Sequence, residues 1–331
     1  MFSMISSRKQ FVRASGAAAI ALAVSGKAAQ SQSPPPAVAV RLASAPDEDV
    51  TPALYAQEKG LFRRAGLDVH ITRSNSGAAV AAAVAGGAVD IGKSSLIALI
   101  SARARGIPFH LIAPAGEYNT DAPVVGMIVR SDGAIRSARD LNGKTVSVPA
   151  LKDLFAVATM GWIDAHGGDS SSVRFIELPA SAVPQAIAEG RVDAASIANP
   201  ILGEALDAGK VRLLGRSFDA IAPHFLFACW FCSADYSAKN RDTVDRFVRV
   251  IQEAAMYANA HHAEMVDIIA RFTLLDPKIV ARLTRTTHGV AIDPRQIQPL
   301  IDAAVKYKVI PASFDARDMV DAAALKPRTA S

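Results

Sequence analysis

One sequence pattern occurs twice, about a hundred residues apart, and it constrains the fold more than any other feature. Ala78-Ala79-Val80 leads through Val84 and Gly87 to Val89-Asp90, and Ser181-Ala182-Val183 leads at the same spacings through Ile187 and Gly190 to Val192-Asp193. In each copy two apolar residues four apart form one face of a short helix, a glycine ends the helix, and a short apolar strand follows. The pattern predicts two similar α/β units, and therefore two lobes with a cleft between them. The alternative is chance matching in alanine-rich sequence.

Strands and helices alternate along most of the chain, which predicts parallel sheets covered by helices. Apolar runs predict strands at 38–42, 67–72, 89–92 and 109–113, with helices over 51–64 and 76–86 and near 96–100. Two longer apolar runs, 124–129 and 225–231, are interpreted as the segments that cross between the lobes. The predicted parts are a signal peptide (1–28), a flexible lead-in (29–37), a first lobe with the C-terminal helices (38–122 and 226–331) and a second lobe (123–225).

The amino terminus reads as a secretory leader. Arg8-Lys9 and Arg13 form its basic end, Ala14 to Val24 its apolar core, and small residues follow around 26–30. Such a short apolar core cannot anchor a protein permanently in a bilayer. The context of Arg8-Lys9 resembles a twin-arginine signal with lysine in the second place, which leaves the Sec and Tat routes open. We expect cleavage near 26–30 and a soluble periplasmic protein.

Charge and cysteine content exclude several classes of protein. The net charge of +5 comes mainly from four basic residues of the leader, and the remainder has 32 basic against 31 acidic residues, which gives no support for nucleic-acid binding. Cys229 and Cys232 lie three apart in an apolar, strand-like run, so they should point to opposite faces as buried thiols, with no disulfide or shared metal. A redox role for them stays open. No histidine has companions at metal-ligand spacing. We predict no catalytic residues, metal or cofactor.

Several segments together resemble a known family. They are 51–62 (TPALYAQEKGLF), 65–69 (AGLDV), 89–92 (VDIG), 140–146 (DLNGKTV) and 190–194 (GRVDA), in this order. The set is similar to periplasmic substrate-binding proteins of the nitrate/sulfonate/taurine type, the SsuA/THI5-like family, which serve ABC importers. The resemblance implies a two-lobed α/β periplasmic-binding-protein fold of type II. Each lobe would be a mostly parallel sheet flanked by helices, and two crossover segments would join the lobes.

Ligands of open parallel sheets bind beyond the carboxyl ends of the strands, where helix N-termini favour anions. The candidate ligand-binding residues lie in the loops expected there: Pro46, Asp47, Asn75, Ser76, Gly77, Lys93, Ser94, Ser95, Glu117, Tyr118, Leu151, Lys152 and Asn199. Arg73, Lys93 and Lys152 would suit an anion, and Glu117 an amine or hydroxyl of the same ligand. Ordinary helix capping or a solvated surface position is the alternative for each. The family often has an aromatic residue and an acid before the proline at Pro200; Ala198-Asn199 depart from this, so the usual substrates do not transfer directly.

The sequence therefore predicts the periplasmic, monomeric solute-binding component of an ABC transport system. It would capture a small anionic organic molecule, sulfonate- or carboxylate-like, and deliver it to an inner-membrane permease without chemical change. One alternative is an enzyme of the THI5-like pyrimidine synthase type. Those enzymes have a cysteine-rich motif, which the segment Cys229-Trp230-Phe231-Cys232 of this chain distantly resembles. Another is the ligand-binding module of a sensor.

Overall fold

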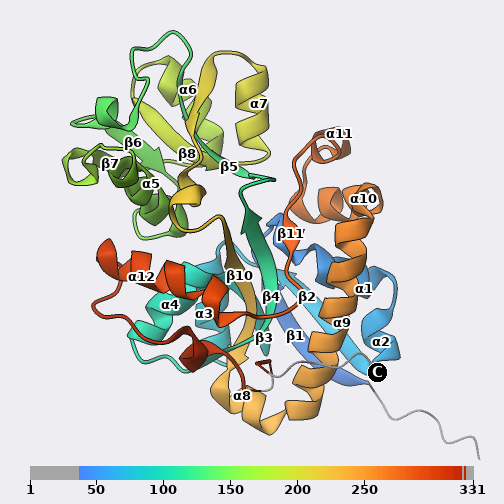
Figure 1. The fold of residues 1–331 in the computed structure, drawn as a ribbon. Coiled ribbons are helices and arrows are strands. Elements are labelled where there is room, and N and C mark those ends of the chain that lie inside the picture. Colours follow the sequence, from blue (N-terminus) through green and yellow to red (C-terminus); the bar gives the residue numbers. More distant parts are fainter. Residues whose placement is uncertain (1–36, 323, 326–331) are drawn as a thin grey trace, which may run out of the picture. The chain divides into compact units, whose positions relative to one another are not determined.

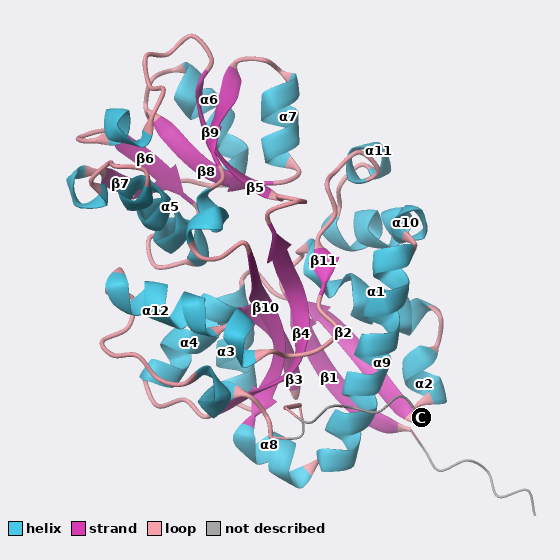
Figure 2. Ribbon diagram, viewed as in Figure 1, coloured by secondary structure: helices cyan, strands magenta, loops and turns pink. Residues whose placement is uncertain are grey.

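The computed structural model describes residues 37–322 and 324–325 and contains two mixed sheets flanked by helices (Figure 1). The predicted signal peptide and nearly all of the lead-in fall outside the described residues. Figure 2 shows helices against both faces of each sheet, as the alternating pattern predicts. The α/β class and the two-sheet architecture are thus confirmed, although neither sheet is wholly parallel.

The first sheet has the strand order β11-β4-β10-β3-β1-β2. Its strands are β1 (Val38–Ser44), β2 (Leu67–Arg73), β3 (Ile91–Ser95), β4 (Phe109–Asn119), β10 (His224–Ser233) and β11 (Thr287–His288). Strand β1 is parallel to β2 and β3, whereas β10 is antiparallel to β3 and β4. Strands β1 to β4 therefore share one direction, and their carboxyl ends lie along one edge.

The second sheet has the order β7-β6-β8-β5-β9. Its strands are β5 (Val125–Arg130), β6 (Thr145–Val148), β7 (Arg174–Glu177), β8 (Ala194–Ala198) and β9 (Val211–Gly215). Strand β6 is parallel to β7 and β8, and β5 is antiparallel to β8 and β9. The apolar runs that the sequence suggested as crossings are therefore strands, β5 and β10. They are apolar because both faces of each strand are buried.

The chain crosses between the sheets just before each of these strands, at 120–124 and 216–223. Hydrogen bonds join the two crossing segments. The Thr120 N–H donates to the Pro223 carbonyl at 3.0 Å, and the hydroxyls of Tyr118 and Thr120 donate to Asp219 Oδ1 at 2.6 and 2.7 Å. At most about 3.5 Å per residue, the short crossing at 120–124 keeps the carboxyl end of β4 close to the start of β5.

The repeated sequence pattern is a structural repeat. Gly87 and Gly190, with φ of +73° and +69°, end helices α3 (Gly77–Ala85) and α6 (Val183–Ala188) in a conformation that favours glycine. The Asp90 N–H donates to the Arg41 carbonyl at 2.9 Å while the Arg41 N–H donates to Asp90 Oδ2 at 2.8 Å. Asp193 and Thr145 form the same two bonds, at 2.9 and 2.8 Å. Chance matching does not account for this agreement.

The remaining helices cover the sheets or pack beyond them. They are α1 (Thr51–Glu58), α2 (Leu61–Arg64), α4 (Leu96–Ala104), α5 (Leu154–Ala165), α7 (Ile201–Asp207), α8 (Ala234–Lys239), α9 (Arg241–Ala260), α10 (His262–Thr273), α11 (Pro277–Val280) and α12 (Gln298–Lys306). Thr51 is the first residue of α1 and not its N-cap: its hydroxyl donates to the Glu48 carbonyl at the end of a 3-10 turn, and Val50 precedes the helix. Among the described residues, no helix has the length and apolar character needed to span a membrane.

The apolar core forms on both faces of the first sheet. Cys229 belongs to the cluster of Leu96, Leu154 and Phe218, and Cys232 belongs to the cluster of α1 and α9. The two thiols point to opposite faces of β10, are fully buried and form no disulfide. This confirms the geometric prediction. The first cluster also contains residues of both sheets, so the two halves share part of one core.

Candidate functional site

Four of the predicted site residues meet where α3 and α4 begin. Ser76 is the N-cap of α3, and its Oγ accepts the Ala79 N–H at 3.2 Å. A Cβ on Gly77 would lie 2.5 Å from Ser94 Oγ and 3.4 Å from the Ser95 nitrogen, so only glycine permits this approach. These four predicted residues lie together in the structure, although Ser94 and Ser95 are the last residues of β3 and not a loop after it. Asn75 lies exposed in the same turn.

The chemistry of this junction suits an acceptor-rich group. Ser94 is buried, and its Oγ has no hydrogen-bond partner among residues 37–322 and 324–325, an unusual state for a buried polar group. The Ser95 side chain makes no capping bond at the start of α4. Both helix starts also direct positive dipole ends and free N–H groups to the same place. A hydroxyl and main-chain donors are thus available to one anionic group.

Lys93 does not have the free ammonium that the sequence suggested. Its side chain is buried, and Nζ lies 2.8 Å from Asp47 Oδ2 and 2.5 Å from Asp49 Oδ1. Burial alone would lower the pKa of Lys93, but the two carboxylates outweigh it and raise that pKa above its ordinary value. Burial raises the pKa of Asp49 to about 6 against the opposing effect of Lys93. The ammonium is therefore already neutralised. Pro46 is half-buried in the same turn.

The prediction that Glu117 and Tyr118 lie in a loop after the fourth strand is wrong. Both lie within β4, which is eleven residues long because β10 and β11 pair with its second half. Glu117 Oε2 lies 2.9 Å from His224 Nε2. Tyr118 is fully buried, and burial followed by its bond to Asp219 raises the pKa of its hydroxyl. Tyr118 therefore anchors the crossing segments.

On the second sheet, the predicted residues lie at the start of α5. Leu151 and Lys152 are exposed, and the Leu151 N–H donates to Glu177 Oε1 at 2.9 Å. Sequence reasoning missed Asp153, although an aspartate before an apolar run is a typical N-cap signal. Its Oδ1 accepts the Ala156 N–H at 2.9 Å, and burial, opposed by main-chain donors, raises its pKa to about 7.

Asn199 directly follows β8, at the carboxyl end of that strand. Its N–H donates to the Val124 carbonyl at 3.0 Å, beside the crossing. A Cβ on Gly203 would lie 3.6 Å from Asn199 Oδ1 and 3.8 Å from Leu283 Cδ2. Two residues beyond Leu283, Arg285 Nε lies 2.5 Å from Glu48 Oε1, next to Asp47 in sequence.

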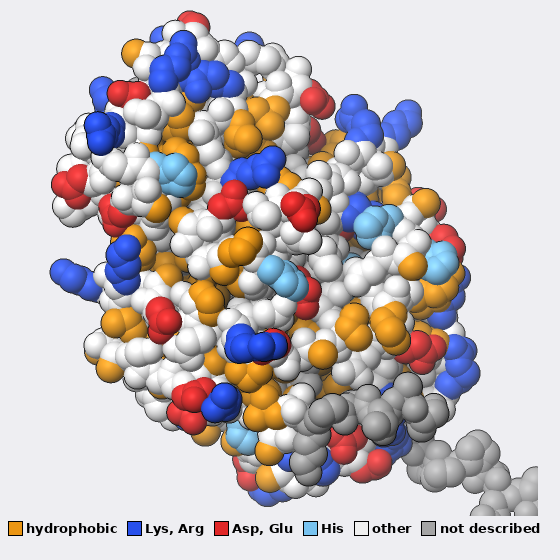
Figure 3. Space-filling model, viewed as in Figure 1, with side chains coloured by type: hydrophobic (Ala, Val, Ile, Leu, Met, Phe, Trp, Pro, Cys, Tyr) orange, Lys and Arg blue, Asp and Glu red, His pale blue; other side chains and the backbone are white. Residues whose placement is uncertain are grey.

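Nearby groups that sequence reasoning missed come from distant parts of the chain. His288 is buried, and its Nδ1 has no hydrogen-bond partner within the part of the chain that the structure describes. Burial lowers the pKa of His288 to about 3, with Arg285 adding to the effect. His224 and Asp219 lie a hundred residues from the groups they bind, so no local pattern could identify them. Charges of both signs are interspersed over the face shown in Figure 3. Within the described ranges, no three His, Cys, Asp or Glu side chains are placed to hold a metal ion.

Comparison with known proteins identifies one family, which includes relatives named as binding proteins and relatives named as synthases. The sequence pattern of the family described as NMT1/THI5 like matches residues 47–265. A Bacillus subtilis protein, provisionally named an aliphatic sulfonates-binding protein, is 26% identical over 285 residues, covering 83% of each chain. The yeast 4-amino-5-hydroxymethyl-2-methylpyrimidine phosphate synthase THI13 is 25% identical over 229 residues, covering 63% of each chain. The periplasmic aliphatic sulphonate-binding protein SsuA of Escherichia coli shares the fold, with a TM-score of 0.72, 18% identity and coverage of 86% of this chain and 97% of SsuA.

Proposed function

Because this chain belongs to the NMT1/THI5-like family, we propose that it is the solute-binding component of an ABC import system. Its ligand is a small anionic organic molecule of the sulfonate or carboxylate class, bound between the two sheets. The bound protein delivers this ligand unchanged to a permease of the inner membrane. In this proposal the protein is a periplasmic monomer, and it is exported by a leader that is cleaved near residues 26–30.

The observation that supports an anionic ligand is the junction of α3 and α4. Ser94 is buried, its Oγ has no hydrogen-bond partner among the described residues, and it lies so close to Gly77 that a Cβ there would stand 2.5 Å from it. A sulfonate or carboxylate oxygen would accept from Ser94 and from the N–H groups at the helix starts, where the dipoles add favourable charge. Specificity in this proposal comes from main-chain donors and a serine hydroxyl.

A cation from the opposite side completes the proposed site. Lys93 is held by Asp47 and Asp49, whereas Lys152 is exposed and forms no ion pair within the described part of the chain. We assign to Lys152 the role of covering the anionic group when the second sheet closes over the first. Asn199, beside the crossing segment, would supply a further hydrogen bond.

The test is isothermal titration of the purified protein with alkanesulfonates, carboxylates, nitrate and pyrimidines. Gly77→Val would place carbon atoms against Ser94 Oγ and should weaken binding by at least about tenfold, the cost of one lost charged hydrogen bond. The matched control is Gly86→Ala at the other end of α3, where a Cβ would meet the carbonyl oxygens of Ala82 at 3.4 Å and Ala83 at 4.0 Å. Unchanged affinity in Gly77→Val, with the fold intact, would refute this location.

Release of unchanged ligand separates this proposal from an enzyme related to the yeast synthase. The two cysteines of this chain are poor candidates for reactive groups, since burial raises the pKa of both thiols, that of Cys232 to about 12. Mass spectrometry of the ligand after prolonged incubation should therefore recover it intact. A product that accumulates with time would favour the synthase-type alternative.

A further inference from the structure

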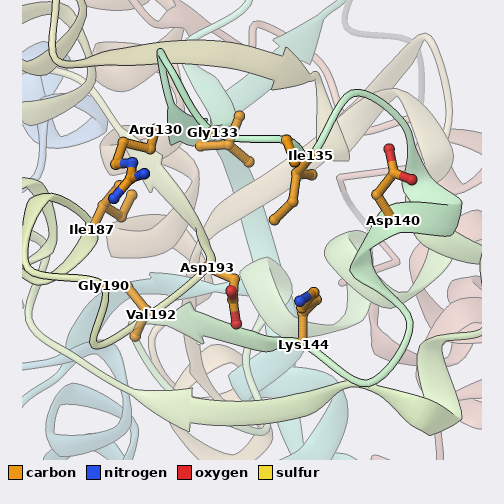
Figure 4. Close-up of a pocket in the computed structure, with 11 residues that line it drawn as sticks. Arg130, Gly133, Ile135, Asp140, Lys144, Ile187, Gly190, Val192 and Asp193 are labelled. Atoms are coloured by element: carbon orange, nitrogen blue, oxygen red, sulfur yellow. The ribbon is translucent and has the colours of Figure 1, made fainter.

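A pocket lies at the edge of the second sheet where β5 ends and β6 and β8 begin (Figure 4). Its volume is about 400 Å³. Ile135, Ile187 and Val192 contribute apolar wall, and Lys144 and Asp193 project into the space between them. The pocket lies on the amino side of the parallel strands, whereas the predicted ligand site lies beyond their carboxyl ends.

The charged groups of this pocket differ in whether they have partners. Arg130 Nε lies 2.6 Å from Asp132, outside the pocket lining. Asp140 accepts from Ser137 through both the N–H and the hydroxyl. Asp193 Oδ2 accepts the Thr145 N–H, but the carboxylate pairs with no cationic side chain within the described ranges. Lys144 likewise forms no ion pair there, so two opposite charges line one pocket without binding each other.

The internal repeat shows what such an aspartate binds when a cation is present. In the first sheet, Arg41 Nη2 and Nε lie 2.6 and 3.1 Å from the two oxygens of Asp90, which also accepts the Arg41 N–H. The position equivalent to Arg41 is Thr145, whose short side chain carries no charge. The second copy thus keeps the carboxylate and its main-chain bond but lacks the guanidinium.

We propose that this pocket binds a small zwitterion of the apolar α-amino acid class. The ligand's ammonium group takes the place of the missing guanidinium on Asp193, and its carboxylate binds Lys144. Its apolar side chain packs against Ile135 and Ile187. A pocket of this size is at the lower end of the range for small-molecule sites, which fits a ligand of about ten heavy atoms. The positive and negative ends of such a molecule match two charges of opposite sign that line one pocket and have no ion-pair partner in the described part of the chain.

The experiment titrates the full chain with L-leucine by isothermal calorimetry, alongside 4-methylpentanoate, which lacks the ammonium group, and 3-methylbutylamine, which lacks the carboxylate. L-leucine should bind at one site per chain, and each analogue about ten- to a hundredfold more weakly, since each loses one charged hydrogen-bonded group. Lys144→Met should weaken L-leucine binding by the same factor. Asp90→Asn, at the first-sheet position equivalent to Asp193, should leave it unchanged.

The most specific variant is Thr145→Arg, which copies the arrangement of Arg41 on Asp90. Its guanidinium would pair with Asp193, so L-leucine binding should disappear while the melting temperature is maintained or raised. Three results would each overturn the proposal: no L-leucine binding at millimolar concentration, binding that survives both Thr145→Arg and Lys144→Met, or equal affinity for 4-methylpentanoate. The Gly77→Val variant shows which site L-leucine occupies. If this variant no longer binds L-leucine, the amino acid binds at the junction of α3 and α4 and not in the pocket beside Asp193.

Discussion

Replacing Lys93 with methionine distinguishes a structural ion from a ligand-binding one. Methionine retains most of the apolar stem but removes the ammonium that lies 2.5 Å from Asp49 and 2.8 Å from Asp47. The Asp49 side chain is only 4% exposed, so the variant leaves a buried carboxylate without its counter-ion. Breaking a buried ion pair in this way costs about 3–5 kcal/mol. We predict a loss of that size in the free energy of unfolding at pH 8.

The pH dependence of this loss follows from the direction of the Asp49 pKa shift. Burial already raises the pKa of Asp49 to about 6, and removal of Lys93 takes away the influences that lower it. A carboxyl whose folded pKa exceeds its unfolded value loses stability as the pH rises between the two. The deficit of the variant should therefore be smaller at pH 5 than at pH 8, by about 1.4 kcal/mol for each unit of additional pKa shift.

Urea unfolding followed by circular dichroism at both pH values measures this effect. The double variant Lys93→Met/Asp49→Asn removes both buried charges and should recover much of the stability lost at pH 8. If Lys93→Met instead unfolds at the parent urea concentration at both pH values and fails only to bind ligand, Lys93 is a ligand-binding cation. The structural assignment would then be wrong.

Three further predictions concern single groups. Asp153→Asn keeps an N-cap acceptor for Ala156 but removes a carboxyl whose pKa burial raises to about 7, so the variant should gain stability in urea unfolding, and the gain should be larger at pH 8 than at pH 5. Tyr307→Phe removes the 2.9 Å bond from α12 to Asp164 on α5; it should cost about 1 kcal/mol, measured by thermal unfolding, and Phe should be tolerated sterically. Finally, thiol titration should detect no reaction at Cys229 in the folded protein and full reaction in urea, because burial raises its pKa.

The parts of the site that could be predicted depend on local geometry. Ser76 and Gly77 were identifiable because N-caps and close approaches of the backbone require particular residue types at fixed offsets. Ser94 and Ser95 followed from the same reasoning, since a strand that runs into a helix places its last residues at the carboxyl edge. These four residues do meet in the structure.

The parts that could not be predicted depend on partners distant in sequence. The length of β4, and hence the placement of Glu117 and Tyr118 inside a strand, is set by pairing with β10 and β11, more than a hundred residues later. Lys93 appeared to be a free cation because its carboxylates lie 44 and 46 residues earlier, in a turn with no motif. A side chain's charge is visible in a sequence, but whether that charge is already neutralised is not.

The internal repeat allows such charges to be compared within one chain, because the two copies place equivalent aspartates, Asp90 and Asp193, in the same backbone setting. Both copies keep an aspartate whose carboxylate accepts a main-chain N–H at 2.8 Å from the strand beside it, so this bond is the part of the arrangement that the fold requires. Only the first copy adds a guanidinium, half exposed on the surface, and ion pairs of that kind contribute little to stability. A fold can therefore lose the arginine at small cost while its carboxylate remains. Asp193 is such a carboxylate, and the pocket beside it is where a ligand's cation could take the arginine's place.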